Sequence, residues 1–304
     1  GYTNSPTNGT PVVNSINQMT MENQEINVSV SQIDTTAWDG VMAYVSVRDH
    51  YGNPITGLTG RNFLVVDSGA LIDRLTVAPV NNRLMNQDKN YALVVDSSGS
   101  MSGKPLDDAK QAVLAFASNI KKKEKLSVTN FNTDVSTVLK TGESIESLEG
   151  KLKEVNPTGG TALYDATQNA ILQLKGWRGR KVVIVFTDGG ENSSRKVKGL
   201  DQLIKQAKDT ETTVYTIRVG SDTEGANDTE NLKRLATETG GEYYFAPSAA
   251  EISALYKHIS NCIDFEYKID YKAPLSTDTG RFIEITTKLG KETNRIKFDY
   301  SVNK

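Results

Sequence analysis

Asp96, Ser98 and Ser100 alternate along the chain directly after the continuous apolar run Tyr91–Val95. In an extended loop, alternate side chains lie on one side of the backbone, so these three residues can direct their oxygens to one point. One carboxylate with two hydroxyls is a hard-oxygen set that suits a divalent cation such as Mg²⁺. The alternative is a tight strand-to-helix turn with no ligand. That explains Gly99 and one serine, but not the aspartate with two spaced hydroxyls.

Two further motifs follow in the chain. Residues Asn156–Asp165 form a glycine-rich loop that leads into a helical pattern, and Lys181–Gly190 is a buried strand that ends in Thr-Asp-Gly-Gly. The order Asp-x-Ser-x-Ser, Gly-Gly-Thr and Thr-Asp-Gly resembles the von Willebrand factor type A domain with its metal-ion-dependent adhesion site. The resemblance covers about residues 86–264, and it is specific because three separated motifs agree.

The resemblance implies a metal site of five residues, all intact in this chain: Asp96, Ser98, Ser100, Thr161 and Asp188. In the family, the two serines and one of Thr161 or Asp188 typically bind the cation directly. Other members of the set act partly through water. The expected cation is Mg²⁺, with Mn²⁺ or Ca²⁺ as alternatives.

The ligand set favours a binding module over an enzyme. A metal held mainly by neutral hydroxyls keeps much of its positive charge, so it can accept a carboxylate from outside. We therefore expect a metal-dependent protein-binding module, for adhesion or complex assembly, whose partner presents an acidic side chain. The alternative is a metal-dependent hydrolase or phosphatase of Rossmann-like fold.

Enzymatic chemistry would need groups that the motifs do not supply. Phosphatases of the haloacid dehalogenase type need a second carboxylate two residues after the first, where this chain has Ser98. A serine hydrolase needs a histidine base, and the only histidines are His50 and His258. The candidate catalytic acids near the site loops are Glu191, Asp165 and Asp222–Glu224. Their other possible roles are solvated loop charges or partners that orient metal ligands.

Length and composition limit the remaining classes. A chain of 304 residues is expected to contain two domains. The net charge of −2 gives no basic signature for nucleic acid, and the apolar runs are strand-sized, so we expect no direct membrane insertion. The single Cys262 excludes an internal disulfide and is expected in a helix core. The sequence leaves the oligomeric state open.

The middle of the chain alternates strand and helix patterns. Helices are expected at residues 104–120, 145–155, 162–174, 200–209, 229–239 and 249–262. Buried or paired strands are expected at residues 91–96, 126–131, 135–139, 182–186, 214–219 and 242–245. Strands joined by helices imply a Rossmann-like α/β domain with a mostly parallel sheet covered on both faces. We expect six strands, one of them an antiparallel edge.

Both flanks of this region have a hydrophobic period of two, which is typical of half-buried strands. Three strands alone would make a weak domain, so we predict one all-β immunoglobulin-like sandwich from residues 21–85 plus 265–304. The α/β domain, residues 86–264, would be inserted in it. The alternative is two separate small β elements.

The segment Arg48–Leu58 resembles the immunoglobulin-like part that precedes the type A domain in many bacterial proteins. Residues 1–20 are rich in Asn, Thr, Ser, Pro and Gly, which predicts a flexible leader. The leader and the bacterial resemblance together predict an extracytoplasmic prokaryotic protein that is secreted, periplasmic or tethered to the surface.

Overall fold

The structure is a computed structural model that describes residues 14–15, 26–35, 40–81, 88–220, 226–275 and 280–301. The chain divides into two compact units. One unit is residues 88–257, and the other combines residues 1–87 with 258–304.

The unit of residues 88–257 is organised around a six-stranded sheet in the order β10-β9-β8-β11-β12-β13. Its strands are β8 (Lys89–Asp96), β9 (Glu124–Phe131), β10 (Val135–Leu139), β11 (Arg180–Thr187), β12 (Thr213–Val219) and β13 (Tyr243–Ala246). All neighbours are parallel except β10, which runs antiparallel to β9 at one edge. This arrangement confirms the predicted six strands with one antiparallel edge.

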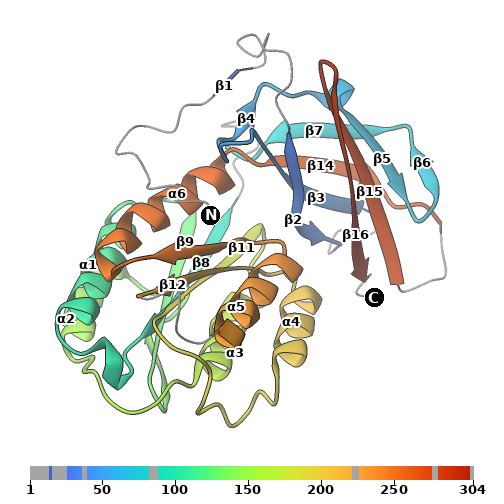
Figure 1. Ribbon diagram of the computed structural model, residues 1–304. Helices are drawn as coiled ribbons and strands as arrows, with labels where there is room; N and C mark the ends of the chain where they lie inside the picture. Colours follow the sequence, from blue (N-terminus) through green and yellow to red (C-terminus); the bar gives the residue numbers. More distant parts are fainter. Residues whose placement is uncertain are drawn as a thin grey trace. The chain divides into compact units, whose positions relative to one another are not determined.

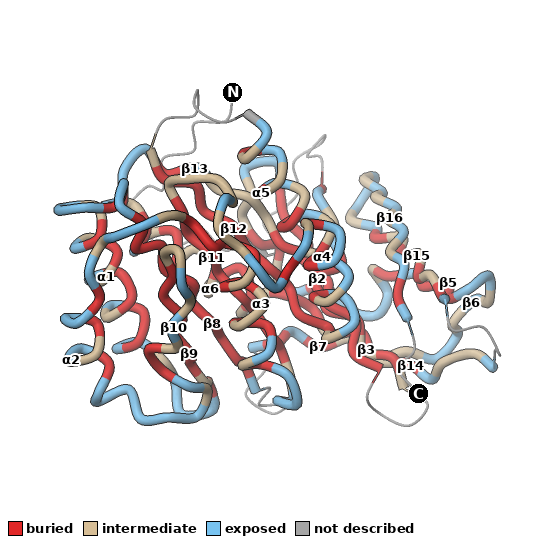
Figure 2. Tube along the Cα trace, turned by 90° about the horizontal axis from the view of Figure 1, so that it is seen from below, coloured by how far each residue is buried: buried red, intermediate tan, exposed pale blue. Residues whose placement is uncertain are grey.

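Helices cover both sides of this sheet (Figure 1). They are α1 (Lys104–Ser118), α2 (Leu148–Lys153), α3 (Leu163–Leu174), α4 (Leu200–Asp209), α5 (Ala226–Glu238) and α6 (Ile252–Asp264). On one face Val94 of β8 packs in a core with Ala170 of α3. On the other face the Tyr91 ring meets Phe116 of α1 edge-on, with ring centroids 5.1 Å apart. Because alternate residues of β8 serve opposite faces, its whole length is buried (Figure 2).

Two helices end earlier than the hydrophobic pattern predicts. The helix expected at residues 145–155 is a 3₁₀ turn, Ile145–Ser147, followed by α2. Pro157 disfavours a helical conformation at the residue before it, which limits how far this helix extends. Helix α1 stops at Ser118, two residues before the predicted end, where the Ser118 hydroxyl and the side-chain amide of Asn119 both donate to the Ala115 carbonyl.

The other unit contains two four-stranded antiparallel sheets, in the orders β2-β3-β14-β7 and β16-β15-β5-β6. The strands are β2 (Asn27–Asp34), β3 (Gly40–Arg48), β5 (Phe63–Asp67), β6 (Ala70–Ile72), β7 (Leu75–Pro79), β14 (Tyr267–Lys272), β15 (Gly280–Leu289) and β16 (Glu292–Ser301). Strands from both ends of the chain pair within each sheet, β14 with β3 and β15 with β5. Side chains of both sheets, among them Val45 and Ile285, belong to one core.

Several details of this unit differ from the prediction. The short strand β6 was not predicted, nor was the parallel pair of β1 (Asn14–Ser15) with β4 (Ile55–Thr56). Apart from β1, the predicted leader lies outside the described residues. Strand β14 begins at Tyr267 rather than at the predicted Phe265, because the Phe265 amide still donates to the Asn261 carbonyl and continues the helical turn.

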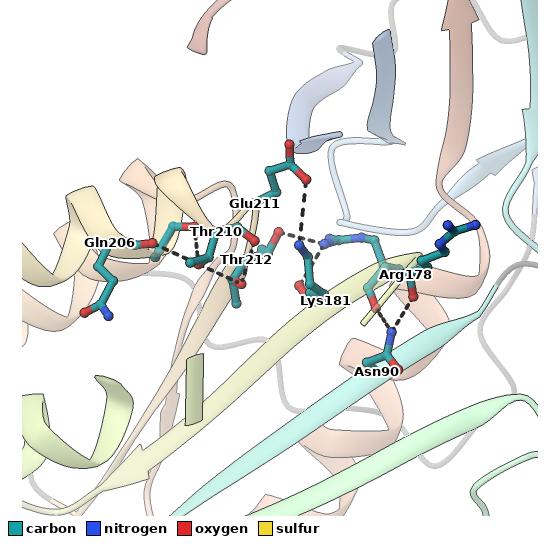
Figure 3. Close-up of polar contacts among 10 residues, drawn as sticks. Asn90, Arg178, Lys181, Gln206, Thr210, Glu211 and Thr212 are labelled. Atoms are coloured by element: carbon teal, nitrogen blue, oxygen red, sulfur yellow. Dashed lines mark hydrogen bonds and ion pairs between the residues drawn. The ribbon is translucent and has the colours of Figure 1, made fainter. Parts of the chain in front are cut away.

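Polar side chains also gather at the amino ends of the parallel strands (Figure 3). The Asn90 amide at the start of β8 donates to the Arg178 carbonyl at 2.7 Å. Lys181 of β11 lies 3.7 Å from the Glu211 carboxylate, and both side chains are buried. The buried Lys181 at this edge therefore has a partner of opposite charge.

Candidate metal centre

The carboxyl ends of β8 and β11 bring two predicted metal-site residues together, because the strands are parallel neighbours that pair up to Val95 and Phe186. Asp96 is the last residue of β8, and its side chain is fully buried. One of its oxygens accepts the Ser98 N–H at 2.7 Å, and the other accepts the Thr187 hydroxyl at 2.5 Å. Asp96 therefore fixes the turn after β8 and ties it to the end of β11.

Three side-chain oxygens of the predicted set, from the residues after Asp96 and from the end of β11, contact one another in succession. Ser98 Oγ is 3.1 Å from Ser100 Oγ, and Ser100 Oγ donates to Asp188 Oδ1 at 2.9 Å. Oxygens on neighbouring corners of an octahedron around Mg²⁺, each about 2.1 Å from the ion, lie about 3.0 Å apart. The spacing and the hard-oxygen chemistry of this donor set therefore fit such a cation.

The glycine-rich loop carries the fifth residue, Thr161. Gly159 has φ +69°, and a Cβ there would lie 2.4 Å from Thr133 Oγ1, so the loop approaches its neighbour as only glycine allows. The Gly159 carbonyl accepts the Gly99 N–H at 3.1 Å. The Thr161 hydroxyl lies 3.7 Å from the position of a Cβ on Gly189. Of the described hydrogen bonds, none joins this hydroxyl to the other four residues.

The pKa values of the two carboxyl groups at this edge are both raised above their ordinary value. Burial raises the pKa of Asp96 to about 6, against the opposing effect of its bonds to Ser98 and Thr187, and the nearby Asp188 adds to the rise. Burial also raises the pKa of Asp188, although Ser100 and Arg218 oppose it. A cation between these groups would favour their charged forms.

Any metal centre here depends on hydroxyl ligands. Within the described part of the chain, no group of three or more His, Cys, Asp or Glu side chains could hold a metal ion. The five-residue set supplies only two carboxylates, together with three hydroxyls.

Glu191, one of the candidate catalytic acids, is engaged in structural bonds. Its carboxylate accepts the N–H groups of Tyr164, Ser193 and Ser194 at 2.7 to 2.9 Å, and the Ser194 hydroxyl at 2.6 Å. The bond from Tyr164 ties the loop after β11 to the start of α3, and the other three fix the loop itself. Glu191 thus acts here as a loop anchor.

Asp165, the second candidate acid, is engaged in the same way. Its carboxylate accepts three consecutive backbone N–H groups, those of Arg195, Lys196 and Val197. Burial alone would raise the pKa of Asp165, but these donors outweigh it and hold the pKa below its ordinary value. The third candidate, Asp222–Glu224, lies outside the described residues.

Sequence reasoning missed three residues that shape the site. Thr187 bonds Asp96, the Thr133 hydroxyl accepts the Gly160 N–H at 2.7 Å, and Asn192 bonds the backbone of Thr161. Only Thr187 had a local signal, since it lies inside the Thr-Asp-Gly motif. The other two act across long separations in sequence, which no local pattern reveals.

The sequence model of the von Willebrand factor type A domain family matches residues 90–258, more than half of the chain. The chain therefore belongs to this family, and its α/β unit has the fold that the motifs predicted.

Curated proteins from two animals are similar in sequence to about 60% of this chain. Inter-alpha-trypsin inhibitor heavy chain H4 of Sus scrofa is 23% identical over 216 residues, which cover 64% of this chain and 23% of that protein. Heavy chain H3 of Pongo abelii is 26% identical over 202 residues, 60% of this chain and 22% of the relative. The chain thus spans less than a quarter of the length of these relatives.

Among solved structures, a von Willebrand factor type A protein from Catenulispora acidiphila superposes with a TM-score of 0.52. The likeness covers 92% of this chain and 73% of that chain at 12% identity, so it concerns the fold alone. Among the described residues of the present chain, no helix is both long and apolar enough to cross a membrane.

Proposed function

We propose that this chain is a metal-dependent protein-binding module. An intact metal-ion-dependent adhesion site of Asp96, Ser98, Ser100, Thr161 and Asp188 holds one divalent cation, most favourably Mg²⁺. An Asp or Glu side chain of a protein partner completes the coordination. The module serves adhesion or complex assembly.

The main observation for the proposal is a row of three side-chain oxygens. Ser98 Oγ lies 3.1 Å from Ser100 Oγ, which lies 2.9 Å from Asp188 Oδ1. Two of the three belong to neutral hydroxyls. A bound divalent cation would supply a partly uncompensated positive charge that an external carboxylate can neutralise. Membership of the type A family, whose members mediate protein–protein interactions, supports the same function.

The alternative, a metal-dependent hydrolase or phosphatase, receives less support from the site. The candidate bases that the structure describes are Glu191 and Asp165. The Glu191 carboxylate already accepts four hydrogen bonds, and the Asp165 carboxylate accepts three backbone N–H groups. A general base needs an oxygen within reach of the proton that it removes. We therefore propose no catalytic residue.

Calorimetric titration with Mg²⁺ tests the cation site. The wild-type protein should bind one Mg²⁺, and the double variant Ser98→Ala/Ser100→Ala should lose detectable binding, because two of the three spaced oxygens are gone. Ser102→Ala is the matched control, since Ser102 is exposed and lies just beyond the site. Equal affinity in the double variant and the wild type would refute the site.

Acceptance of an outside carboxylate is tested with acetate on the Mn²⁺-loaded protein. Bound Mn²⁺ should enhance the relaxation of the acetate methyl protons, whereas acetamide, which is neutral, should show only the effect of free Mn²⁺. Identical relaxation of acetate and acetamide would contradict the adhesion function while leaving the cation site in place.

We further propose that the two antiparallel sheets form an immunoglobulin-like sandwich of residues 21–85 plus 265–304, with the type A domain, residues 86–264, inserted in it. The shared apolar core and the pairing of strands from both chain ends support this division.

The protein is proposed to act outside the cytoplasm of a prokaryote. Cell fractionation should find it in the periplasmic fraction or among the peptides released from intact cells by surface proteolysis. Recovery only from the cytosol would contradict this location.

A further inference from the structure

Asn192 forms hydrogen bonds with both backbone groups of Thr161, its N–H and its carbonyl. The Thr161 N–H donates to Asn192 Oδ1 at 2.8 Å, and the Thr161 carbonyl accepts the Asn192 N–H at 3.0 Å. The Ser193 N–H reaches the same carbonyl at 3.2 Å. Thr161 is buried, so its peptide groups depend on these partners to replace water. The backbone of one proposed metal residue is thus fixed by a loop that begins at another, Asp188.

This loop is itself anchored on helix α3. The residue before the helix, Ala162, supplies no side-chain cap, so the first amides of α3 need partners from elsewhere. Glu191 accepts the Tyr164 N–H at 2.8 Å, and the Ser194 hydroxyl accepts the Asp165 N–H at 3.0 Å. A carboxylate at this end of a helix is also favoured by the helix dipole. Asn192 therefore lies between two anchored neighbours.

The two loops pack closely against each other at Gly160. A Cβ on Gly160 would lie 2.3 Å from Ser193 Oγ and 2.8 Å from Asn192 Oδ1. The loops approach this closely only because residue 160 has no side chain. The position of Thr161 relative to Asp188 is consequently set by backbone bonds and close packing together.

We propose that Asn192 is a positioning residue that adjusts the site to a cation of the size of Mg²⁺. The inference rests on the proposed function. Mg²⁺ requires near-ideal octahedral geometry at about 2.1 Å, whereas Ca²⁺ accepts six to eight oxygens at about 2.3–2.6 Å in flexible arrangements. A clamp that holds the Thr161 backbone against the Asp188 loop favours the smaller and more demanding ion. Without the clamp, the site loses Mg²⁺ affinity more than Ca²⁺ affinity.

The test compares Asn192→Leu, which keeps the branching at Cγ but removes the acceptor, with Asn192→Asp, which keeps an acceptor oxygen. Asn192→Leu should weaken Mg²⁺ binding by about tenfold or more, as loss of a ligand-orienting partner does in other metal sites. Its Ca²⁺ affinity should change by less than about threefold, because Ca²⁺ tolerates displaced ligands. Asn192→Asp should keep the Mg²⁺ over Ca²⁺ preference of the wild type.

Asn156→Leu is the matched control. Asn156 belongs to the same glycine-rich loop, is exposed, and donates only to the nearby Glu154 carbonyl among the described bonds. This variant should retain the wild-type affinity for both ions. Equal losses of Mg²⁺ and Ca²⁺ affinity in Asn192→Leu, or no loss of either, would overturn the positioning role.

Hydrogen exchange of the Thr161 amide in the metal-free protein gives a readout that does not depend on the cation. The amide should be protected in the wild type and in Asn192→Asp, and should exchange faster in Asn192→Leu, with no change at the Ala162 amide, which donates to the Asn132 carbonyl at 2.7 Å. Unchanged protection in Asn192→Leu overturns the clamp. A wild-type protein that binds no Mg²⁺ instead refutes the proposed function and, with it, the selectivity of the site.

Discussion

The charged side chains at the two ends of the mostly parallel sheet have different partners. At the amino end, Lys89 lies 2.7 Å from the Glu124 carboxylate. Figure 3 shows the second pair there, Lys181 with the Glu211 carboxylate, 3.7 Å apart. At the carboxyl end two acids, Asp96 and Asp188, approach each other. No ion pair within the described part of the chain involves either of them.

The difference agrees with the proposal that a cation binds at the carboxyl end of the sheet. A buried carboxylate with a basic partner is already neutralised, so it serves folding. The buried Asp96 and the half-buried Asp188 are bonded to hydroxyl and amide donors, and only Asp188 also has a nearby cation, Arg218; the pKa values of both carboxyl groups remain raised. In open α/β sheets, ligands bind at the carboxyl ends of the strands, in agreement with this contrast.

The largest expected effect is the loss of cation binding in Asp96→Ala at the carboxyl end. The variant removes both the negative charge and the bonds that hold Ser98 and Thr187, so Mg²⁺ binding should fall below detection by calorimetry. Far-ultraviolet circular dichroism should remain that of the wild type, because Asp96 is the last residue of β8 and the backbone pairing of the strand does not use its side chain. Unchanged Mg²⁺ affinity would show that the site is misassigned.

The corresponding change at the amino end, Glu124→Ala, should affect stability instead. It removes a partner of the buried Lys89 ammonium, and breaking a buried ion pair in this way costs about 3 kcal/mol. Urea denaturation should show the lower free energy of unfolding, and Mg²⁺ affinity should stay within about twofold of the wild type. A large loss of Mg²⁺ affinity without loss of stability would abolish the distinction between the two ends.

The pH dependence sharpens the contrast further. The pKa of Asp96 rises from 3.8 to about 6 on burial, so the folded metal-free protein binds a proton more tightly than the unfolded chain does. Its contribution to stability is therefore present below about pH 4 and is lost as the pH rises toward 6. Mg²⁺ competes with that proton, so its affinity should fall about tenfold per pH unit below pH 6. Calorimetry between pH 5 and 7.5 measures this slope, and a flat profile would contradict it.

The smallest expected effect comes from Gly160→Ala. The new Cβ would press on the side chains of Ser193, which can rotate away, and of Asn192, which need shift only slightly and can keep its bond to Thr161, so Mg²⁺ affinity should drop only about threefold. Gly150→Ala in α2 is the control, because no atom lies within 4 Å of its added Cβ. It should leave affinity unchanged and stabilise the helix by about 0.5–1 kcal/mol. Equal Mg²⁺ affinities in the two variants would mean that the loops have more freedom than their packing implies.

Local sequence patterns were sufficient for most of the α/β unit. The apolar run of β8 and the spaced helix patterns carry their periods within single segments, so they predicted the six strands and the antiparallel edge. Short elements without such a period, such as β6 with three residues, were missed. Helix ends were also misplaced where side chains such as Ser118 compete for the last carbonyls.

The sequence by itself determined the types of oxygen that gather at the end of β8 and β11, because Asp96 and Asp188 each follow a strand that had to be buried. Only the tertiary structure decided how those oxygens are held. The Thr161 backbone is fixed by Asn192, 31 residues away, and the helix that follows it is capped by Glu191 rather than by a neighbour in sequence. Hydrogen bonds of this kind depend on where two loops meet in space, and the local sequence of one loop does not show which other loop it contacts.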